Sequence, residues 1–346
     1  MAPHTRRSLS RTSLIIATAA TLILVATGCT SGAETGGGAA ATGPKSGKLT
    51  IAYLQKQGDQ QYFVDEAEGA KAAAKTLGNV TVKVVDLGTD ANKAISAVDS
   101  VIAQKVDGII IVVPNQQIGP QVMAAAKAAG IPIMASDDVI KDASGTAAAF
   151  AGFDGTAMGN AVGTEAAKLY KAAGWTTADT RILSGYKQDL SVCSQRVDGA
   201  KDSFTKAIQG DIPKVVDIGT DNSATDAQNK AGAVITANAG VKHWVVWGCN
   251  DENTTGIVTA LQNTGITPSN IIGVGLGAYL ACKDWAAKQD TGNKAALFIS
   301  GVEVGKAALT SMVGLVRDGT KLPAQSIAKT AMVDATTWKT AGVVCT

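Results

Sequence analysis

The chain has 346 residues, long enough for two domains of ordinary size, and 46% of them are hydrophobic while only 17% are charged. Its formal net charge of +2 becomes −1 once the three arginines of residues 1–28 are removed. A near-neutral body without a basic stripe excludes nucleic acid as the expected partner.

The N-terminus has the pattern of an export signal. Arg6, Arg7 and Arg11 precede the apolar stretch SLIIATAATLILVATG, which Cys29 follows. A basic region, an apolar core and small residues are typical of a secretory signal peptide, and the stretch is too short and wrongly flanked to favour a transmembrane helix. The segment VATGC also resembles a bacterial lipobox. We therefore expect a lipoprotein signal peptide over 1–28 and lipidation at Cys29; ordinary cleavage that leaves a free thiol is the alternative.

The segment after this cysteine predicts a tether. The sequence TSGAETGGGAAATGPKSG is rich in Gly, Ala, Ser and Thr and has no apolar periodicity. Such a composition is typical of a flexible linker, which we expect over 29–47. A lipid anchor with this spacer would hold the body of the protein outside the cytoplasm, at the outer face of the cell membrane.

From Lys48 onward, short apolar runs rich in Val and Ile alternate with segments of helical period. Strands that alternate with helices in this way indicate βαβ units and a parallel sheet. In the first half of the chain we expect strands at 49–55, 80–88, 108–114, 131–138 and 148–154, and helices at 62–78, 92–104, 121–130 and 156–173.

The same cycle begins again at Arg181. Two successive runs of about five βα units predict an α/β protein with two doubly wound lobes rather than one large sheet. Ligands of such sheets lie beyond the carboxyl ends of the strands. The second run has expected strands at 181–186, 214–221, 243–251, 271–277 and 296–300, with helices between them.

Two adjacent aspartates, Asp137 and Asp138, end the apolar run IPIMASDD. Like charges side by side repel, so water, a cation or the hydroxyls of a bound molecule must compensate them. Lys56 and Arg196 are the candidate cations. Other strand ends supply amides and aromatic rings, a mixture that a ligand dense in hydroxyls requires. The alternative is that the pair only caps the following loop.

Seven segments, taken in their order and spacing, resemble one family: AYLQKQGDQQYF, AISAVDSV, GIIIVVP, MASDDV, RVDG, KHWVVWGCND and IIGVGLG. They are similar to the sugar-binding proteins of bacterial ABC importers, of the type I periplasmic class that includes the L-arabinose-binding proteins. The resemblance extends from Lys48 to Gly342. It implies two doubly wound parallel-sheet lobes joined by a three-strand hinge, the type I periplasmic binding protein fold.

In this family the chain crosses three times between the lobes. The resemblance therefore implies an N-terminal lobe of 48–152 plus 300–328 and a C-terminal lobe of 153–299 plus 329–346. It also implies a ligand site in the cleft between the lobes. The expected ligand-binding residues are Lys56, Gln60, Tyr62, Phe63, Asp137, Asp138, Phe153, Arg196, Cys249 and Asn250.

The chain departs from the arabinose pattern after the strand at 271–277. Gly277 and Leu280 stand where the arabinose-binding relative has an Asn and an Asp, and Cys249 replaces a methionine. With fewer polar partners in the second lobe, a different pentose, a deoxy sugar or a sugar alcohol would fit as well as L-arabinose.

The resemblance implies a monomeric solute-binding lipoprotein of an ABC importer, not an enzyme. It would capture a monosaccharide or polyol in the cleft and deliver it to the permease subunits, with no cofactor and no metal. A sensor that docks on a chemoreceptor or a histidine kinase would have the same fold and remains the alternative.

Four cysteines besides Cys29 suggest two disulfides in an exported protein, with three possible connectivities; buried free thiols are the alternative. Cys249 ends a strand expected beside the strand that precedes Cys193, which favours Cys193–Cys249 and leaves Cys282–Cys345. Cys249 could equally reach Cys282.

Two other classes of protein are weakly supported. The segment GVGLGA at 273–278 satisfies a dinucleotide-binding pattern, but no acidic residue ends the next strand to hold a ribose. One histidine, His243, remains beyond residues 1–28, too few for a serine–histidine or histidine-rich metal site. A transcription regulator of this architecture needs a helix-turn-helix where this chain has a signal and a linker.

Overall fold

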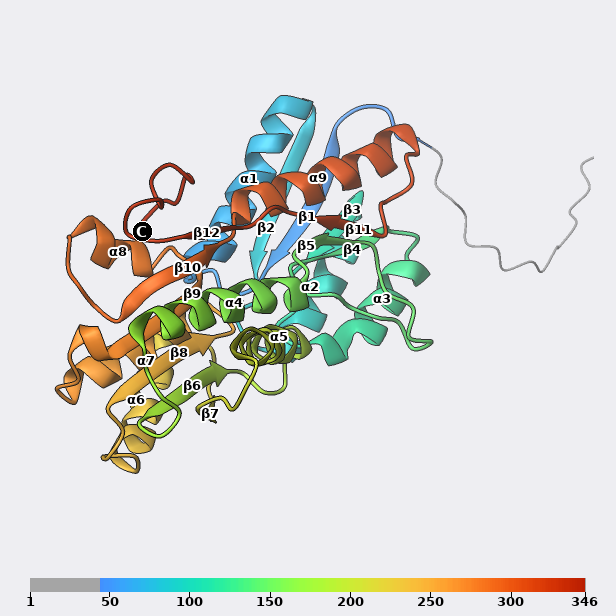
Figure 1. Ribbon diagram of the computed structural model, residues 1–346. Coiled ribbons are helices and arrows are strands. Elements are labelled where there is room, and N and C mark those ends of the chain that lie inside the picture. The colour runs from blue at the N-terminus through green and yellow to red at the C-terminus, as the bar shows by residue number, and fades with distance from the viewer. Residues whose placement is uncertain (1–43, 346) are drawn as a thin grey trace, which may run out of the picture. The chain divides into compact units, whose positions relative to one another are not determined.

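The computed structural model describes residues 44–345 (Figure 1), all within one compact unit, Ala39–Thr346. The predicted signal peptide at 1–28, the predicted lipidation site Cys29 and the linker up to residue 43 lie outside these residues.

The first sheet has six strands, all parallel, in the order β11-β5-β4-β3-β1-β2. The strand β3 is buried along its whole length because helices cover both faces of the sheet, and Ile109, Ile110 and Ile111 are fully buried. We call this sheet and its helices the first lobe. Its strands are β1 (Leu49–Gln55), β2 (Val80–Asp86), β3 (Gly108–Ile111), β4 (Ile133–Ser136), β5 (Phe150–Gly152) and β11 (Gln325–Ile327).

The helices of the first lobe are α1 (Gln61–Leu77), α2 (Ala91–Ala103), the short 3-10 turn η1 (Gln116–Ile118), α3 (Gly119–Ala128) and α9 (Gly301–Asp318). Asp90 caps the N-terminus of α2, since its carboxylate accepts from the main-chain N–H groups of Asn92 and Lys93.

The second sheet repeats this architecture with the order β12-β10-β9-β8-β6-β7. Only its edge strand β12 is antiparallel to its neighbour. We call this sheet and its helices the second lobe. Its strands are β6 (Thr180–Tyr186), β7 (Lys214–Gly219), β8 (His243–Gly248), β9 (Ile271–Gly277), β10 (Asn293–Phe298) and β12 (Ala331–Val333).

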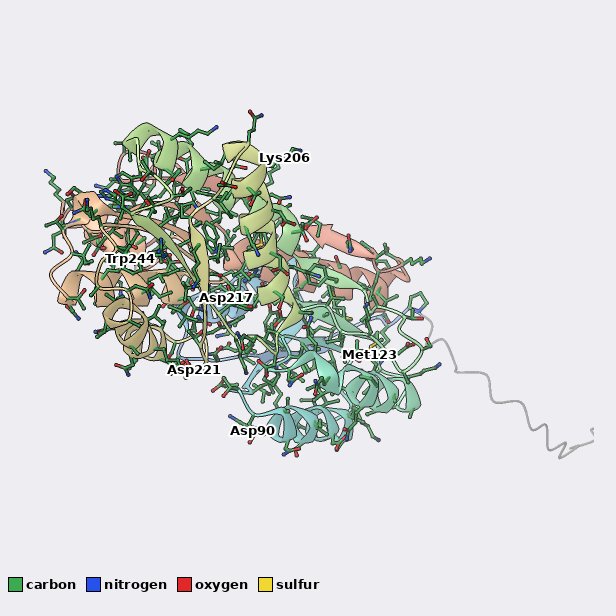
Figure 2. All side chains as sticks on the ribbon, turned by 60° about the horizontal axis from the view of Figure 1, so that its bottom comes forward. Asp90, Met123, Lys206, Asp217, Asp221 and Trp244 are labelled. Atoms are coloured by element: carbon green, nitrogen blue, oxygen red, sulfur yellow. A yellow bond between two sulfur atoms is a disulfide. The ribbon has the colours of Figure 1, made fainter. Side chains whose placement is uncertain are left out.

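The second lobe is covered by α4 (Gly155–Ala173), α5 (Ser191–Ile208), α6 (Ala224–Thr236), α7 (Asp251–Asn263), the turn η2 (Pro268–Asn270) and α8 (Ala281–Ala286). Trp244 of β8 lies inside this lobe, fully buried, whereas Lys206 near the end of α5 lies at its edge (Figure 2). His243, at the start of β8, stacks on Trp175 with 4.5 Å between ring centroids, which is a structural role.

The chain passes between the two sheets three times. It leaves the first sheet after β5, returns after β10 to form α9 and β11, and leaves again before β12. In Figure 1 the orange-red helix α9 accordingly packs beside the blue helix α1, although more than 200 residues separate them in the sequence. Arg317 of α9 strengthens this contact by donating to the carbonyl oxygens of Leu77 and Gly78 at the end of α1.

The contact between α1 and α9 depends on glycine. A Cβ atom at Gly305 would overlap the main-chain oxygen of Glu66 on α1, so the two helix backbones approach each other where no side chain fits. We call this close contact of α1 with α9 at Gly305 the glycine seam. It attaches α9 to the first lobe.

We expect Gly305→Ala to lower the free energy of unfolding by about 1–3 kcal/mol, because the added methyl group forces the helices apart. Gly232→Ala is the matched control: it lies in α6 with no atom within 4 Å of the added Cβ, so it should raise stability by about 0.5–1 kcal/mol. Urea unfolding measures the free energy of unfolding of both variants. Equal changes in the two variants would show that close packing at Gly305 does not stabilise the fold.

Candidate functional site

The two adjacent aspartates lie at the end of β4, where the chain turns sharply. Asp137 adopts the left-handed region with a φ of 58°, which is uncommon for a residue other than glycine. Its N–H group donates to the carbonyl of Ala151 at 2.9 Å, which fixes the turn against β5. Asp138 is completely buried and Asp137 is 7% exposed. Two carboxylates are therefore withdrawn from water and require partners.

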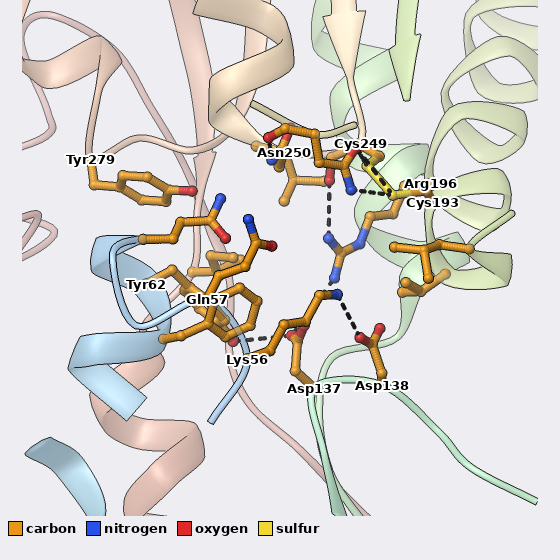
Figure 3. A pocket seen from close by; sticks show the side chains of 17 residues that line it. Lys56, Gln57, Tyr62, Asp137, Asp138, Cys193, Arg196, Cys249, Asn250 and Tyr279 are labelled. Atoms are coloured by element: carbon orange, nitrogen blue, oxygen red, sulfur yellow. Dashed lines mark hydrogen bonds and ion pairs between the residues drawn. A yellow bond between two sulfur atoms is a disulfide. The ribbon is translucent and has the colours of Figure 1, made fainter. Parts of the chain in front are cut away.

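Each carboxylate has a cationic partner. Lys56 directly follows β1, and its Nζ lies 3.1 Å from Asp138 Oδ2 (Figure 3). Arg196 Nη2 lies 3.8 Å from Asp137 Oδ1. The hydroxyl of Tyr62 also donates to Asp137 Oδ1 at 3.1 Å. Burial and the charge of Asp138 raise the pKa of Asp137, and Arg196 and Lys56 oppose that rise. The compensation expected from the sequence is present, with one cation from each lobe.

Two polar atoms of this cluster are buried without a partner among residues 44–345. They are Oδ1 of Asp138 and Nε of Arg196. A buried acceptor and a buried donor left unsatisfied each cost about 1–3 kcal/mol. A bound group that both donates and accepts, such as a hydroxyl, would satisfy them.

Arg196 is held by the second lobe. It lies on α5, and its Nη1 donates to the carbonyl of Cys249 at the end of β8 at 3.0 Å. The structure pairs Cys193 with Cys249 and Cys282 with Cys345. The first of these disulfides joins α5 to the end of β8, with the two Cα atoms 4.9 Å apart. The disulfide therefore holds α5, which carries Arg196, against the end of β8, where the carbonyl of Cys249 accepts from the guanidinium.

These groups line a cavity of about 470 Å³, counting the open space at its mouth. Side chains of both lobes converge on it (Figure 3). Nine of the ten residues predicted to bind ligand are in its lining. The exception is Phe153, which lines a neighbouring pocket together with Asp137 and Val192. The full lining is Lys56, Gln57, Gln60, Tyr62, Phe63, Asp137, Asp138, Leu190, Val192, Cys193, Arg196, Asn222, Cys249, Asn250, Leu276, Tyr279 and Ile299.

Asn250 borders the cavity, but its amide is already engaged. The side-chain Oδ1 accepts from the N–H of Asn253 at 3.0 Å and so caps α7, while Nδ2 donates to the carbonyl of Asn222 at 2.9 Å. Its structural role is therefore visible, whereas its predicted contact with ligand stays a prediction.

Sequence reasoning missed several residues of the second lobe. Tyr279 follows β9, and its hydroxyl donates to both carboxylate oxygens of Glu252 at 2.8 and 3.0 Å. Burial raises the pKa of Glu252 to about 7, opposed by hydrogen bonds from Gln60 and Tyr279. Asn222 lies in the loop after β7, a strand end that could have been inspected like the others. The apolar Leu190, Val192, Leu276 and Ile299 carry no sequence signal that separates them from core residues.

A direct contact joins the two lobes beside the cavity. Gln116 of η1 accepts at Oε1 from the N–H and the hydroxyl of Ser191, at 3.1 and 2.6 Å. Its Nε2 donates to the carbonyl of Val139 at 2.9 Å, which orients the amide toward the second lobe. The N-terminus of α5 is thus bound to the first lobe.

A further carboxyl group lies behind the aspartates. Glu66 of α1 is fully buried, and its Oε1 accepts from the hydroxyl of Ser136, which lies 3.2 Å from the hydroxyl of Tyr53. Burial, with the neighbouring charge of Asp137, raises the pKa of Glu66 well above its usual value. Through Ser136 this carboxyl group supports the end of β4 behind the two aspartates.

A family model of the periplasmic binding protein domain matches residues 51–321, most of the chain. The chain therefore belongs to the periplasmic binding protein family. The resemblance inferred from the sequence is confirmed, and so is the fold of two α/β lobes with parallel sheets.

This periplasmic binding protein has relatives along most of its length. The ABC transporter L-arabinose-binding periplasmic protein of Azospirillum brasilense is 28% identical over 301 residues, covering 84% of this chain and 88% of the relative. The L-arabinose-binding periplasmic protein of Escherichia coli is 26% identical over 248 residues, covering 70% and 74%.

Among solved structures, an ABC transporter periplasmic solute binding protein from Actinobacillus succinogenes with bound D-allose matches with a TM-score of 0.74 at 22% identity, covering 85% of this chain and 100% of that one. This likeness shows the fold.

Within residues 44–345 no group of three or more His, Cys, Asp or Glu side chains is placed to hold a metal ion. None of the helices in this part of the periplasmic binding protein combines the length and apolar character that crossing a bilayer requires.

The pKa of Glu252 predicts a pH effect. A carboxyl whose folded pKa is about 7 and whose usual pKa is 4.5 binds more protons in the folded state between these values, so its contribution to stability is lost as pH rises from 4.5 to 7. We expect Glu252→Gln to remove this loss, so that the variant gains up to about 2–3 kcal/mol relative to the wild type across that interval. Denaturant unfolding at pH 4.5, 6 and 7.5 measures it. If the stability of the variant and of the wild type changed with pH in the same way, the raised pKa of Glu252 would be contradicted.

Proposed function

We propose that this protein is the solute-binding component of an ABC importer and that it captures a monosaccharide or sugar alcohol between its lobes. One observation carries the proposal: a charged cluster built from both lobes leaves Asp138 Oδ1 and Arg196 Nε buried and unpartnered at one cavity. The names of the relatives, both L-arabinose-binding periplasmic proteins and one of an ABC transporter, support the same class of ligand.

The charges of the cluster favour a neutral ligand. Lys56 pairs with Asp138, and Arg196 pairs with Asp137, so these four groups sum to zero before any ligand binds. A hydroxyl donates to the carboxylate and accepts from the guanidinium, which are the strong, charge-assisted kinds of hydrogen bond. The chain holds the ligand and performs no reaction on it, in accord with relatives that are binding proteins rather than enzymes.

Closure follows from the division of the cluster between lobes. A ligand bonded to Asp138 alone would leave Arg196 unsatisfied, so only the closed arrangement satisfies both half-sites. The proposed lobes are 48–152 plus 300–328 and 153–299 plus 329–346, and the three chain crossings would form the hinge. The closed form would present both lobes to the permease.

We propose the importer role over a sensor that docks on a chemoreceptor or a histidine kinase, because the relatives are named for transport and binding. We also propose export by the signal peptide at 1–28, lipid attachment at Cys29 and a tether to the outer face of the membrane, with a monomeric binding unit. The basic and apolar pattern of the N-terminus and the linker composition support this.

A thermal-shift screen against pentoses, hexoses, deoxy sugars and polyols tests the function. A ligand at a hundredfold excess over its Kd stabilises the folded state by about 2.7 kcal/mol. For the sugar that binds, calorimetry should show that Asp138→Ala and Arg196→Ala each weaken affinity about 100-fold or more, since each strands a buried charged partner. Gln60→Ala should cost only about 1 kcal/mol. No shift with any sugar would refute the proposal, and unchanged affinity in the first two variants would remove those residues from the site.

The contact between Gln116 and Ser191 predicts a kinetic effect. We expect Gln116→Ala to release a bound sugar about 5- to 10-fold faster, because the variant loses hydrogen bonds that only the closed form makes. Gln117→Ala is the control, since its side chain makes no hydrogen bond within residues 44–345. Stopped-flow dissociation measures both variants. Equal release rates would show that this contact does not stabilise the closed form.

A further inference from the structure

The two sides of the cavity differ in the hydrogen-bonding groups that they leave available. The first lobe offers Asp138 Oδ1, which is buried and unpartnered, and Gln57, whose amide makes no hydrogen bond within residues 44–345 and points toward the cavity (Figure 3). Tyr62 and Phe63 add aromatic rings beside them. Hydroxyl groups of a ligand would therefore gather toward this lobe.

The amides of the second lobe are occupied by the protein itself. Asn222 Oδ1 accepts from the N–H of Lys187 at 3.0 Å and from Asn253 Nδ2 at 2.9 Å, and its own Nδ2 approaches Cys193 Sγ at 3.4 Å. The amide of Asn250 is used in capping α7, and the hydroxyl of Tyr279 is donated to Glu252. Arg196 Nε remains the available donor on this side.

The rest of this side of the cavity is apolar. Leu190 and Val192 lie at the start of α5, the Cys193–Cys249 disulfide joins α5 to the end of β8, and Leu276 lies on the neighbouring strand β9. None of these groups can donate or accept a strong hydrogen bond. A ligand hydroxyl pressed against them would lose its hydrogen bonds to water without replacing them.

We propose that the ligand is a neutral deoxy sugar of the 6-deoxyhexose class, with its methyl group against Leu190 and Val192 and its hydroxyls toward the first lobe. The inference rests on the proposed function and deepens it by naming the substrate class. An apolar pocket rejects a ligand that adds one hydroxyl by about 100-fold at most. The expected preference is therefore about 10- to 100-fold over the parent hexose.

The test is calorimetric titration of the full exported protein with matched pairs: D-fucose and D-galactose, L-fucose and L-galactose, L-rhamnose and L-mannose. The inference expects at least one pair to bind, with the 6-deoxy member about 10- to 100-fold tighter. Equal or tighter binding of the parent hexose overturns it and leaves the proposed function standing. Binding of pentoses or polyols only would also overturn the 6-deoxyhexose inference while leaving the proposed function standing. Binding of no sugar overturns both.

A substitution of the same shape locates the apolar contact. Val192→Thr replaces a methyl group with a hydroxyl at constant volume and should reduce the preference for the deoxy sugar at least threefold. Val302→Thr is the matched control: it is 41% exposed at the start of α9 and lies outside the cavity, so the ratio of affinities should not change. An unchanged ratio in a folded Val192→Thr protein would overturn the placement of the methyl group.

Discussion

The structure depends on placing two adjacent carboxylates out of water at the boundary between two lobes. Asp137 and Asp138 are tolerated there because Lys56 approaches from their own lobe and Arg196 from the other. Removing either cation would leave a buried charge uncompensated, which is far more costly than losing a neutral hydrogen bond. The same arrangement leaves two buried polar atoms, Asp138 Oδ1 and Arg196 Nε, without a hydrogen-bond partner, which a hydroxyl group could satisfy.

Topology brings these charges together. Parallel strands place their carboxyl ends at one edge of each sheet, and the two sheets meet with these edges facing the same cavity. The triple crossing of the chain makes the lobes interdependent. The helix α9, which completes the first lobe, comes after most of the second lobe in the sequence. The glycine seam between α1 and α9 stabilises that late addition.

The second lobe has a different character from the first. Its amides serve as helix caps and loop supports, and a disulfide and aliphatic side chains line its side of the cavity. Arg196 is its principal polar contribution, braced by the carbonyl of Cys249. The two sides of the cavity are therefore chemically different: the first lobe leaves hydrogen-bonding groups available, and the second presents a largely apolar wall with a single cation.

The sequence by itself determined the alternation of strands and helices and the two-lobe fold, because hydrophobic periodicity is a local feature, and the resemblance of seven segments indicated the family. Nine of the ten residues that the resemblance implied lie at one cavity, and several of them follow strand ends, which converge in parallel sheets. Only the tertiary structure decided that Asn250 is a cap, that Phe153 lines a neighbouring pocket, and that Tyr279 and Glu252 form a pair at the edge of the site. The partner of an amide or the face of an aliphatic side chain depends on residues distant in the chain, and no local pattern records that proximity.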